Sequence, residues 1–156
     1  MDKDEAKKKR SKARESVYRL LKYRFRSEKE IADKLKIKGF DKATIDETIR
    51  YFKDLEIIDD RQFARGWISS RLNKPFGPKR IQHELDQKGI ARHIIEEELH
   101  DAFDAYSEAD VVLNLARKRT QKYKGIEPLK AKQRLFGYLS RRGFSTEAIY
   151  KAINQI

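Results

Sequence analysis

The chain has 156 residues, of which 37 are Lys or Arg and 25 are Asp or Glu, so its formal net charge at pH 7 is +12. It contains no cysteine, which excludes disulfides and thiolate metal sites. It also lacks the apolar stretch of a signal peptide and any apolar run of about 18 residues. We therefore expect a cytoplasmic protein with no membrane segment, and the basic excess favours a polyanionic partner.

Apolar periodicity predicts helices throughout the chain. After a basic tail at residues 1–12, which we expect to be disordered, the pattern is that of three repeats of three helices each. The expected repeats are residues 13–55, 56–106 and 107–156. The first helix of each repeat is expected at 13–23, 60–72 and 107–123, and the linkers at 56–59, 73–77 and 124–128. No segment alternates long enough to predict a strand. The sequence therefore predicts an all-α fold of nine helices in an elongated, curved array, in which each unit buries its open face against its neighbour.

A Leu-x-x-x-Gly motif marks the second helix of each repeat. Its residues are Leu35 and Gly39, Leu85 and Gly89, and Leu139 and Gly143. Apolar residues four apart before and after each glycine predict the buried faces of two short helices, and glycine suits a left-handed position between them. Ser27 and Gly77 are expected to cap the second helix of the first two repeats, and Ala131 has that place in the third.

The basic charge is concentrated at the two ends of the chain. Residues 1–26 and residues 107–156 each contain eleven Lys or Arg and four Asp or Glu, whereas residues 27–106 are slightly acidic and include Glu96, Glu97 and Glu98. Some basic residues cluster in the last repeat or next to a helix start, where an anionic ligand would balance them. The candidate contacts are Lys79, Arg80, Arg117, Lys118, Arg119, Lys122, Arg141 and Arg142. A merely solubilising basic surface is the simpler alternative.

Patterns typical of catalysis are weak in this chain. His93, Glu97 and His100 share one helix face at a spacing that suits a divalent metal, but histidines on an acidic helix are more typical of plain surface residues. The chain has no phosphate-binding loop, nucleophile elbow or dinucleotide fingerprint, so we expect no enzyme and no cofactor or metal. A sequence-reading helix-turn-helix is a minor alternative, because Ala32 precedes Gly39 by seven residues instead of about four.

One central segment closely resembles the hallmark of the RecX family, bacterial regulators of the RecA recombinase. The matching residues are Ile58 to Ala64, then Trp67, Gly77, Arg80, Ile81, Leu85 and Lys88-Gly89-Ile90. The flanking repeats match through Ser27 to Glu30, Leu35, Lys38-Gly39-Phe40 and Leu139 to Phe144. The resemblance covers nearly the whole chain after about residue 13. Within the central segment, we expect Asp59 or Asp60 to cap a helix while Phe63 and Trp67 enter the core.

The resemblance implies a protein of three tandem three-helix repeats that lies in the helical groove of the RecA–DNA filament. It implies inhibition of RecA's ATP hydrolysis, strand exchange and co-protease activity, through blocked filament extension or promoted disassembly. This is a role in homologous recombination, DNA repair and the SOS response. We expect a monomer that also binds single- and double-stranded DNA weakly and without sequence preference. The alternative is a sequence-independent nucleic-acid-binding helical protein without a specific protein partner.

Overall fold

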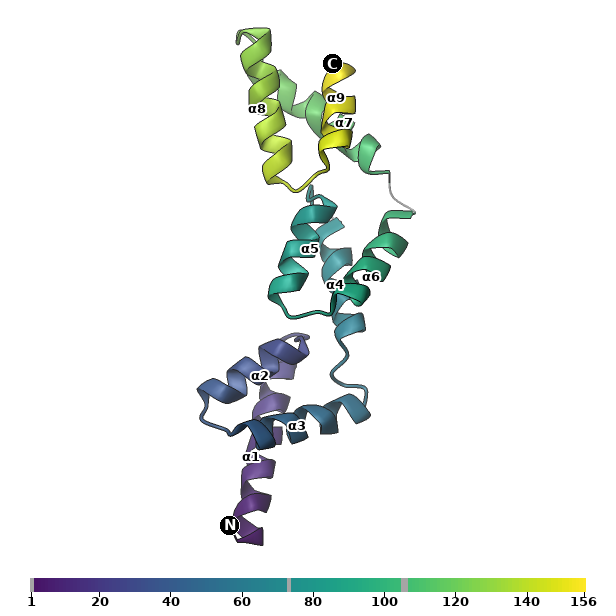
Figure 1. The fold of residues 1–156 in the computed structure, drawn as a ribbon. Helices are drawn as coiled ribbons and strands as arrows, with labels where there is room; N and C mark the ends of the chain where they lie inside the picture. The colour runs from purple at the N-terminus through teal and green to yellow at the C-terminus, as the bar shows by residue number, and fades with distance from the viewer. Residues whose placement is uncertain (1, 73, 105–106) are drawn as a thin grey trace.

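The computed structural model describes residues 2–72, 74–104 and 107–156, and every regular element in those residues is a helix. The helices are α1 (Lys3–Tyr23), α2 (Glu28–Ile37), α3 (Lys42–Asp54), α4 (Asp60–Leu72), α5 (Pro78–Gln87), α6 (Arg92–Asp104), α7 (Glu108–Thr120), the short 3-10 helix η1 (Gln121–Tyr123), α8 (Pro128–Arg141) and α9 (Thr146–Asn154). Three groups of three α-helices follow one another along an elongated molecule, with the termini at opposite ends (Figure 1). The all-α fold of three-helix repeats is confirmed for the described residues.

A few expectations fall on positions that are not described. Met1 begins the expected tail, Asn73 begins an expected linker, and Ala105 and Tyr106 end the expected second repeat; these four lie outside the described residues. In the part that is described, no helix is long and apolar enough to cross a membrane.

The basic start of the chain is helical, so the expectation of a disordered tail does not match the structure. Residues 3–12 form the first half of α1, which continues without a break to Tyr23. Lys9 pairs with Asp41 at 3.0 Å and Arg10 pairs with Glu47 at 3.3 Å. The expectation rested on charge density alone, whereas the structure brings carboxylates of α3 and its cap beside these cations.

Each group of three helices has a hydrophobic core of its own. The first core comprises Val17, Ile31, Leu35, Ile45, Ile49, Phe52 and Ile58. The second comprises Phe63, Ala64, Ile68, Ile81, Leu85, Ile90 and Ile95. The third comprises Val112, Ala116, Leu135, Leu139, Phe144, Ala148, Ile149, Ala152 and Ile153. The expectation that the repeats bury apolar faces against one another therefore does not match these separate clusters. Ile58 packs in the first core although the boundary expected at residue 56 assigns it to the second repeat; the boundaries themselves stay predictions.

The Leu-x-x-x-Gly motif forms the same turn three times. Gly39, Gly89 and Gly143 have φ angles of 91°, 76° and 86°, in the left-handed region that favours glycine. After each glycine, the next N–H donates to the carbonyl of the motif leucine, at 3.2 Å, 3.2 Å and 3.4 Å. This is the Schellman turn, in which an apolar residue after the glycine packs near the residue whose carbonyl is bonded. The spacing of leucine, glycine and the next apolar residue is therefore the spacing of that turn.

The joint between the first two repeats sets the start of α2 against the end of α5. The Ser27 hydroxyl, which accepts from the N–H of Glu30, donates to the Lys88 carbonyl at 2.7 Å. The N–H of Glu28 donates to the Asp60 carboxylate at 2.9 Å. Of the two residues expected as the cap of α4, Asp59 accepts from two N–H groups of that helix, whereas Asp60 joins α4 to α2. Burial raises the pKa of Asp60. The hydrogen bond from the Glu28 N–H acts to lower that pKa but does not outweigh burial.

The joint between the second and third repeats also sets a helix start against a helix end, and its hydrogen bonds connect backbone groups only. The N–H of Gly77 donates to the Arg142 carbonyl at 2.7 Å, and the N–H of Lys79 donates to the Gly143 carbonyl at 3.1 Å. Helix starts have free N–H groups and helix ends have free carbonyls, so α5 and α8 satisfy each other where they meet (Figure 1). A Cβ on Gly143 would lie 2.5 Å from the backbone nitrogen of Arg80, whereas a Cβ on Gly39 would meet nothing within 4 Å.

The third repeat differs at the start of its second helix. The helix α8 begins at Pro128, one turn before the place of Ala131 that the motif spacing predicts. Proline is well tolerated at the first position of a helix because its missing N–H would have no partner there. In the first two repeats the start of this helix lies against the end of another helix, as for Ser27 and Gly77. Among the described residues, no other helix end is hydrogen-bonded to the start of α8, which leaves room for the extra turn.

The joints lead to a prediction for two glycines with matched backbone strain. Gly39→Ala should lower the free energy of unfolding by about 1–2 kcal/mol, because alanine is disfavoured at a positive φ. Gly143→Ala should cost about 1–3 kcal/mol more, because the added Cβ also forces apart two hydrogen bonds of the joint. Urea denaturation measures both costs, and small-angle scattering measures the separation of the repeats. Equal costs with unchanged scattering would show that the joint does not hold the repeats together.

Candidate functional site

The eight basic residues expected to contact a polyanion fall into two groups. Arg80, Arg119 and Arg142 are partly buried and lie over aromatic rings. The other five are exposed: Lys79, Arg117, Lys118, Lys122 and Arg141. The structure therefore brings three of the candidates together at the joint between the second and third repeats.

Arginines and aromatic rings alternate across this joint. The Arg80 guanidinium lies 3.8 Å from the centre of the Phe76 ring. The Arg142 guanidinium lies 5.7 Å from the same ring and 5.0 Å from the Tyr138 ring, and Arg119 lies 4.4 Å from Tyr138. All these distances are within the range of a cation–π contact. Phe76 belongs to the second repeat and Tyr138 to the third, so the contacts cross the joint.

The contacts continue into the second repeat around one carboxylate. The Arg71 guanidinium lies 4.6 Å from the Trp67 ring and 5.4 Å from the Phe76 ring. Glu84 accepts hydrogen bonds from the Trp67 indole N–H and from Arg71, both at 2.8 Å, and pairs with Arg80 at 3.4 Å. Burial acts to raise the pKa of Glu84, but these bonds outweigh it and lower that pKa. Glu84 therefore stays ionised and holds the arginines in place.

We call this set the arginine–aromatic row. It comprises Trp67, Arg71, Phe76, Arg80, Arg142, Tyr138, Arg119 and Tyr123. A guanidinium over an aromatic ring keeps its charge and its planar set of N–H donors, which match phosphate and carboxylate. The row, together with the five exposed cations, can bind an extended anion. Nothing in its composition supplies a nucleophile paired with a base.

Five members of the row were not among the candidate contacts from the sequence, although a simple spacing marks them: Arg71, Phe76, Tyr123, Tyr138, and Trp67, which was expected only in the core. The row consists of pairs of an aromatic residue and an arginine that are four residues apart: Trp67 and Arg71, Phe76 and Arg80, Tyr138 and Arg142, and Arg119 and Tyr123. Residues at this spacing are neighbours on a helix surface. Phe76, Tyr123 and Tyr138 are only partly buried. A search for arginine four residues from an aromatic residue finds these pairs, together with three others: Arg14 and Tyr18, Arg19 and Tyr23, and Arg134 and Tyr138.

The N-terminal basic end differs electrostatically from the row. Four of the eleven Lys and Arg residues in this end pair with carboxylates of the same repeat: Lys9 with Asp41, Arg10 with Glu47, Arg19 with Glu15, and Arg24 with Glu30. Exposed pairs of this kind contribute little to stability, but they partly neutralise the local field. The two basic ends, which have the same formal charge, are therefore not equivalent as anion-binding surfaces.

The acidic helix α6 includes one carboxylate that is not a surface group. Glu98 is only 4% exposed and pairs with Arg61 at 2.8 Å and Arg65 at 2.7 Å, which joins α6 to α4. Burial acts to raise the pKa of Glu98, but the hydrogen bonds from Arg65 and Arg61 outweigh it and lower that pKa. Glu97 pairs with Arg61 at 2.7 Å. Among the described residues, no group of three or more His, Asp or Glu is arranged to hold a metal ion.

Comparisons with known proteins place a family domain on each repeat. The first, second and third three-helix domains of RecX match residues 13–52, 59–99 and 107–153. The chain is 38% identical over 146 residues to the regulatory protein RecX of Chlorobium phaeobacteroides, and the match covers 93% of each chain. It is 32% identical over 145 residues to the regulatory protein RecX of Clostridium beijerinckii, covering 92% of this chain and 67% of that protein.

Solved structures agree with these sequence matches. The crystal structure of RecX from Lactobacillus salivarius superposes with a TM-score of 0.83 at 28% identity, covering 95% of this chain and 96% of that chain. A second crystal structure, of a regulatory protein RecX, superposes with a TM-score of 0.84 at 24% identity and covers 80% of that chain. The second likeness concerns the fold alone.

The charge of the row and its surroundings predicts how DNA binds. We expect weak binding to single and double strands without sequence preference, with log affinity falling linearly against log salt as counterions are released. Replacing Arg117 and Lys118 by Gln should reduce the salt slope by about 1 for each phosphate that is no longer neutralised. Lys151→Gln is the control, because Lys151 pairs with Glu147. Fluorescence anisotropy measures the slopes. A preference for one duplex sequence that persists at high salt would favour an operator-reading protein instead.

The Glu98 ion pairs predict an acid-sensitive contribution to stability. Because the folded-state pKa of Glu98 lies below its ordinary 4.5, the contribution is present above pH 4.5 and is lost as the pH falls through the folded value. Glu98→Gln should lower the free energy of unfolding at pH 7 and make its decline toward pH 3 shallower. Glu96→Gln, at an exposed pair with Arg92, should change neither by more than about 0.5 kcal/mol. Equal urea midpoints for both variants from pH 3 to pH 7 would contradict this role of Glu98.

Proposed function

This chain belongs to the RecX family, and from that membership we propose that it regulates the RecA recombinase by binding the RecA–DNA filament in its helical groove. Binding there inhibits RecA's ATP hydrolysis, strand exchange and co-protease activity, through blocked filament extension or promoted disassembly. The observation that carries the proposal is the arginine–aromatic row across the joint of the second and third repeats. The protein acts as a monomer in the cytoplasm.

The elongated shape supports a groove-bound ligand. The repeats follow one another with the termini at opposite ends, so one molecule presents a long surface and a small end (Figure 1). A helical groove between successive protomers accepts such a shape, and contacts spread along it give affinity without one deep pocket. The joints are hydrogen-bonded and the cores are separate, so each repeat remains a packed unit if the angle between repeats changes.

The row supplies anion contacts in the middle and at the C-terminal end of this surface. Arg80, Arg119 and Arg142 are held by aromatic rings, which reduces the side-chain entropy that their binding to phosphate or carboxylate costs. Five exposed cations extend the positive electrostatic field around these three arginines: Lys79, Arg117, Lys118, Lys122 and Arg141. In the filament these residues meet DNA phosphate or acidic protomer surface. The protein performs no reaction; its residues bind and thereby alter what RecA does.

Titration into RecA at saturating DNA tests the proposal. Substitution of Arg117 and Lys118 by Glu, or of Arg141 and Arg142 by Glu, should raise the concentration for half-inhibition of ATP hydrolysis by about tenfold, because fewer charge-assisted hydrogen bonds then hold the protein on the filament. The wild-type protein should inhibit at well below one molecule per RecA protomer. A competitor that acts only by coating DNA would need enough protein to cover the strand, which is the outcome for a nucleic-acid-binding protein without a protein partner.

Matched controls separate the surface from net charge. The pair Arg92→Glu and Lys151→Glu changes the net charge equally at two exposed residues outside the row, and inhibition should stay close to wild type. Neutralising Glu96 and Glu97 should leave inhibition unchanged or strengthen it, and Glu98 is kept because it is buried. If both basic double variants inhibit as well as wild type, with unchanged helicity and melting, the surface formed by Arg142 of the row and the exposed Arg117, Lys118 and Arg141 is not the binding surface.

A further inference from the structure

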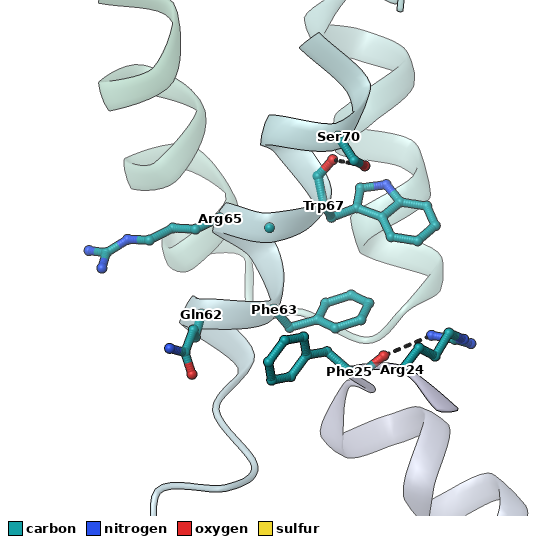
Figure 2. Close-up of a pocket in the computed structure, with 8 residues that line it drawn as sticks. Arg24, Phe25, Gln62, Phe63, Arg65, Trp67 and Ser70 are labelled. Carbon is teal, nitrogen blue, oxygen red and sulfur yellow. Dashed lines mark hydrogen bonds between the residues drawn. The ribbon is translucent and has the colours of Figure 1, made fainter. Parts of the chain in front are cut away.

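A mostly apolar groove lies where the first repeat meets α4, away from the arginine–aromatic row's contacts with the third repeat. Its volume is about 550 Å³, and its lining includes Phe25 from the loop between α1 and α2, and Phe63, Gly66 and Trp67 of α4. Figure 2 shows Phe25 reaching toward Phe63 and Trp67, with Arg24 and Arg65 at the margins. Phe25 is 74% exposed, so most of its apolar surface can be covered by another molecule that enters the groove.

Gly66 is the second observation that points to a ligand in this groove. It lies inside α4, where glycine costs stability relative to alanine. Its φ is not in the left-handed region, and a Cβ added to it would meet nothing within 4 Å. Neither backbone conformation nor packing within the chain therefore requires glycine. Its absent side chain keeps one wall of the groove open, which allows another molecule to approach the helix backbone.

We propose that this groove binds a segment of a partner protein that presents one bulky apolar side chain flanked by carboxylates. The apolar side chain covers Phe25 and fills the space beside Gly66. The carboxylates meet Arg24 and Arg65, which already pair with Glu30 and Glu98 but keep 46% and 64% of their side chains exposed, so N–H donors remain for a second carboxylate. The inference rests on the proposed function, in which the partner is a RecA protomer of the filament.

The ring contacts favour a protein segment over an unstacked nucleic-acid base. The Trp67 ring already stacks on Phe63, with ring centres 5.8 Å apart. It also makes a cation–π contact with the Arg71 guanidinium. The Phe63 side chain is buried and the Trp67 indole N–H is bonded to Glu84. Phe25 is thus the one aromatic residue lining the groove that has a widely exposed ring. A nucleic-acid base could stack on Phe25, but the groove offers no second exposed ring to stack on the other face of that base.

Trp67 is the only tryptophan of the chain, so its emission reports directly on the groove. The probes are a seven-residue peptide with a central Leu between Asp and Glu residues, the same peptide with Lys in place of the acids, and oligothymidylate. The acidic peptide should change the emission saturably, and the Lys peptide should not. Because Trp67 also belongs to the arginine–aromatic row, oligothymidylate is used as a competitor, and it should not displace the acidic peptide. Gly66→Leu should weaken acidic-peptide binding about tenfold or more by filling the space. No response to the acidic peptide, or its displacement by oligothymidylate, would overturn the inference.

Two alanine variants separate binding from stability. Gly66→Ala should raise the melting temperature by about 2–4 °C because alanine favours helix, while it weakens the peptide response. Gly137→Ala, inside α8, should also raise the melting temperature because its Cβ would meet only the end of the Arg141 side chain, but it should leave the peptide response intact. If the Gly66→Leu variant bound both the peptide and the filament as well as wild type, the proposal that this groove is the binding site would be overturned. A wild-type peptide response without RecA inhibition would instead reject the proposed function.

Discussion

The architecture depends on the end-to-end contact between the second helices of successive repeats. The end of α8 meets the start of α5, and the end of α5 meets the start of α2, through N–H, hydroxyl and carbonyl groups. Each joint satisfies the donors of one helix with the acceptors of another, so no apolar face is needed between repeats. This explains why three separate cores can exist in a chain of low apolar content. It also gives Gly143 two reasons to be glycine, because its φ is left-handed and a Cβ would meet the backbone of Arg80 in the neighbouring repeat.

The same joint places the candidate site. Phe76 immediately precedes the cap Gly77, and Arg142 immediately precedes Gly143, so the contact that aligns α5 with α8 also brings the Arg142 guanidinium within 5.7 Å of the Phe76 ring. The row is therefore a consequence of how the repeats stack, and its charges are organised only in the assembled array. A change that opens the joint should disturb the binding surface even when each three-helix core remains folded.

The local patterns were predictable and the long-range polar contacts were not. The Leu-x-x-x-Gly spacing anticipates the Schellman turns and buried leucines, because that turn is encoded within six residues. Glu98 reads as a surface acid in the sequence, since its partners Arg61 and Arg65 are more than thirty residues away. Residues 3–12 read as a disordered tail for the same reason, since Lys9 and Arg10 find their carboxylates near α3. The row was partly accessible through its four-residue spacing, but its continuity across two repeats needed the joint.

The one-turn extension of α8 has a consequence for how long the array can become. At one end of the stack, no other repeat among the described residues packs on Gly39, since a Cβ there would meet nothing within 4 Å. At the other end, α8 begins with Pro128 after Glu127, and the Glu127 carboxylate, which stands where α5 has Gly77, would be repelled by the negative end of another helix. Charge repulsion therefore disfavours a head-to-tail joint between the start of α8 in one copy and the end of α2 in another, and with it the growth of open-ended fibres through that joint.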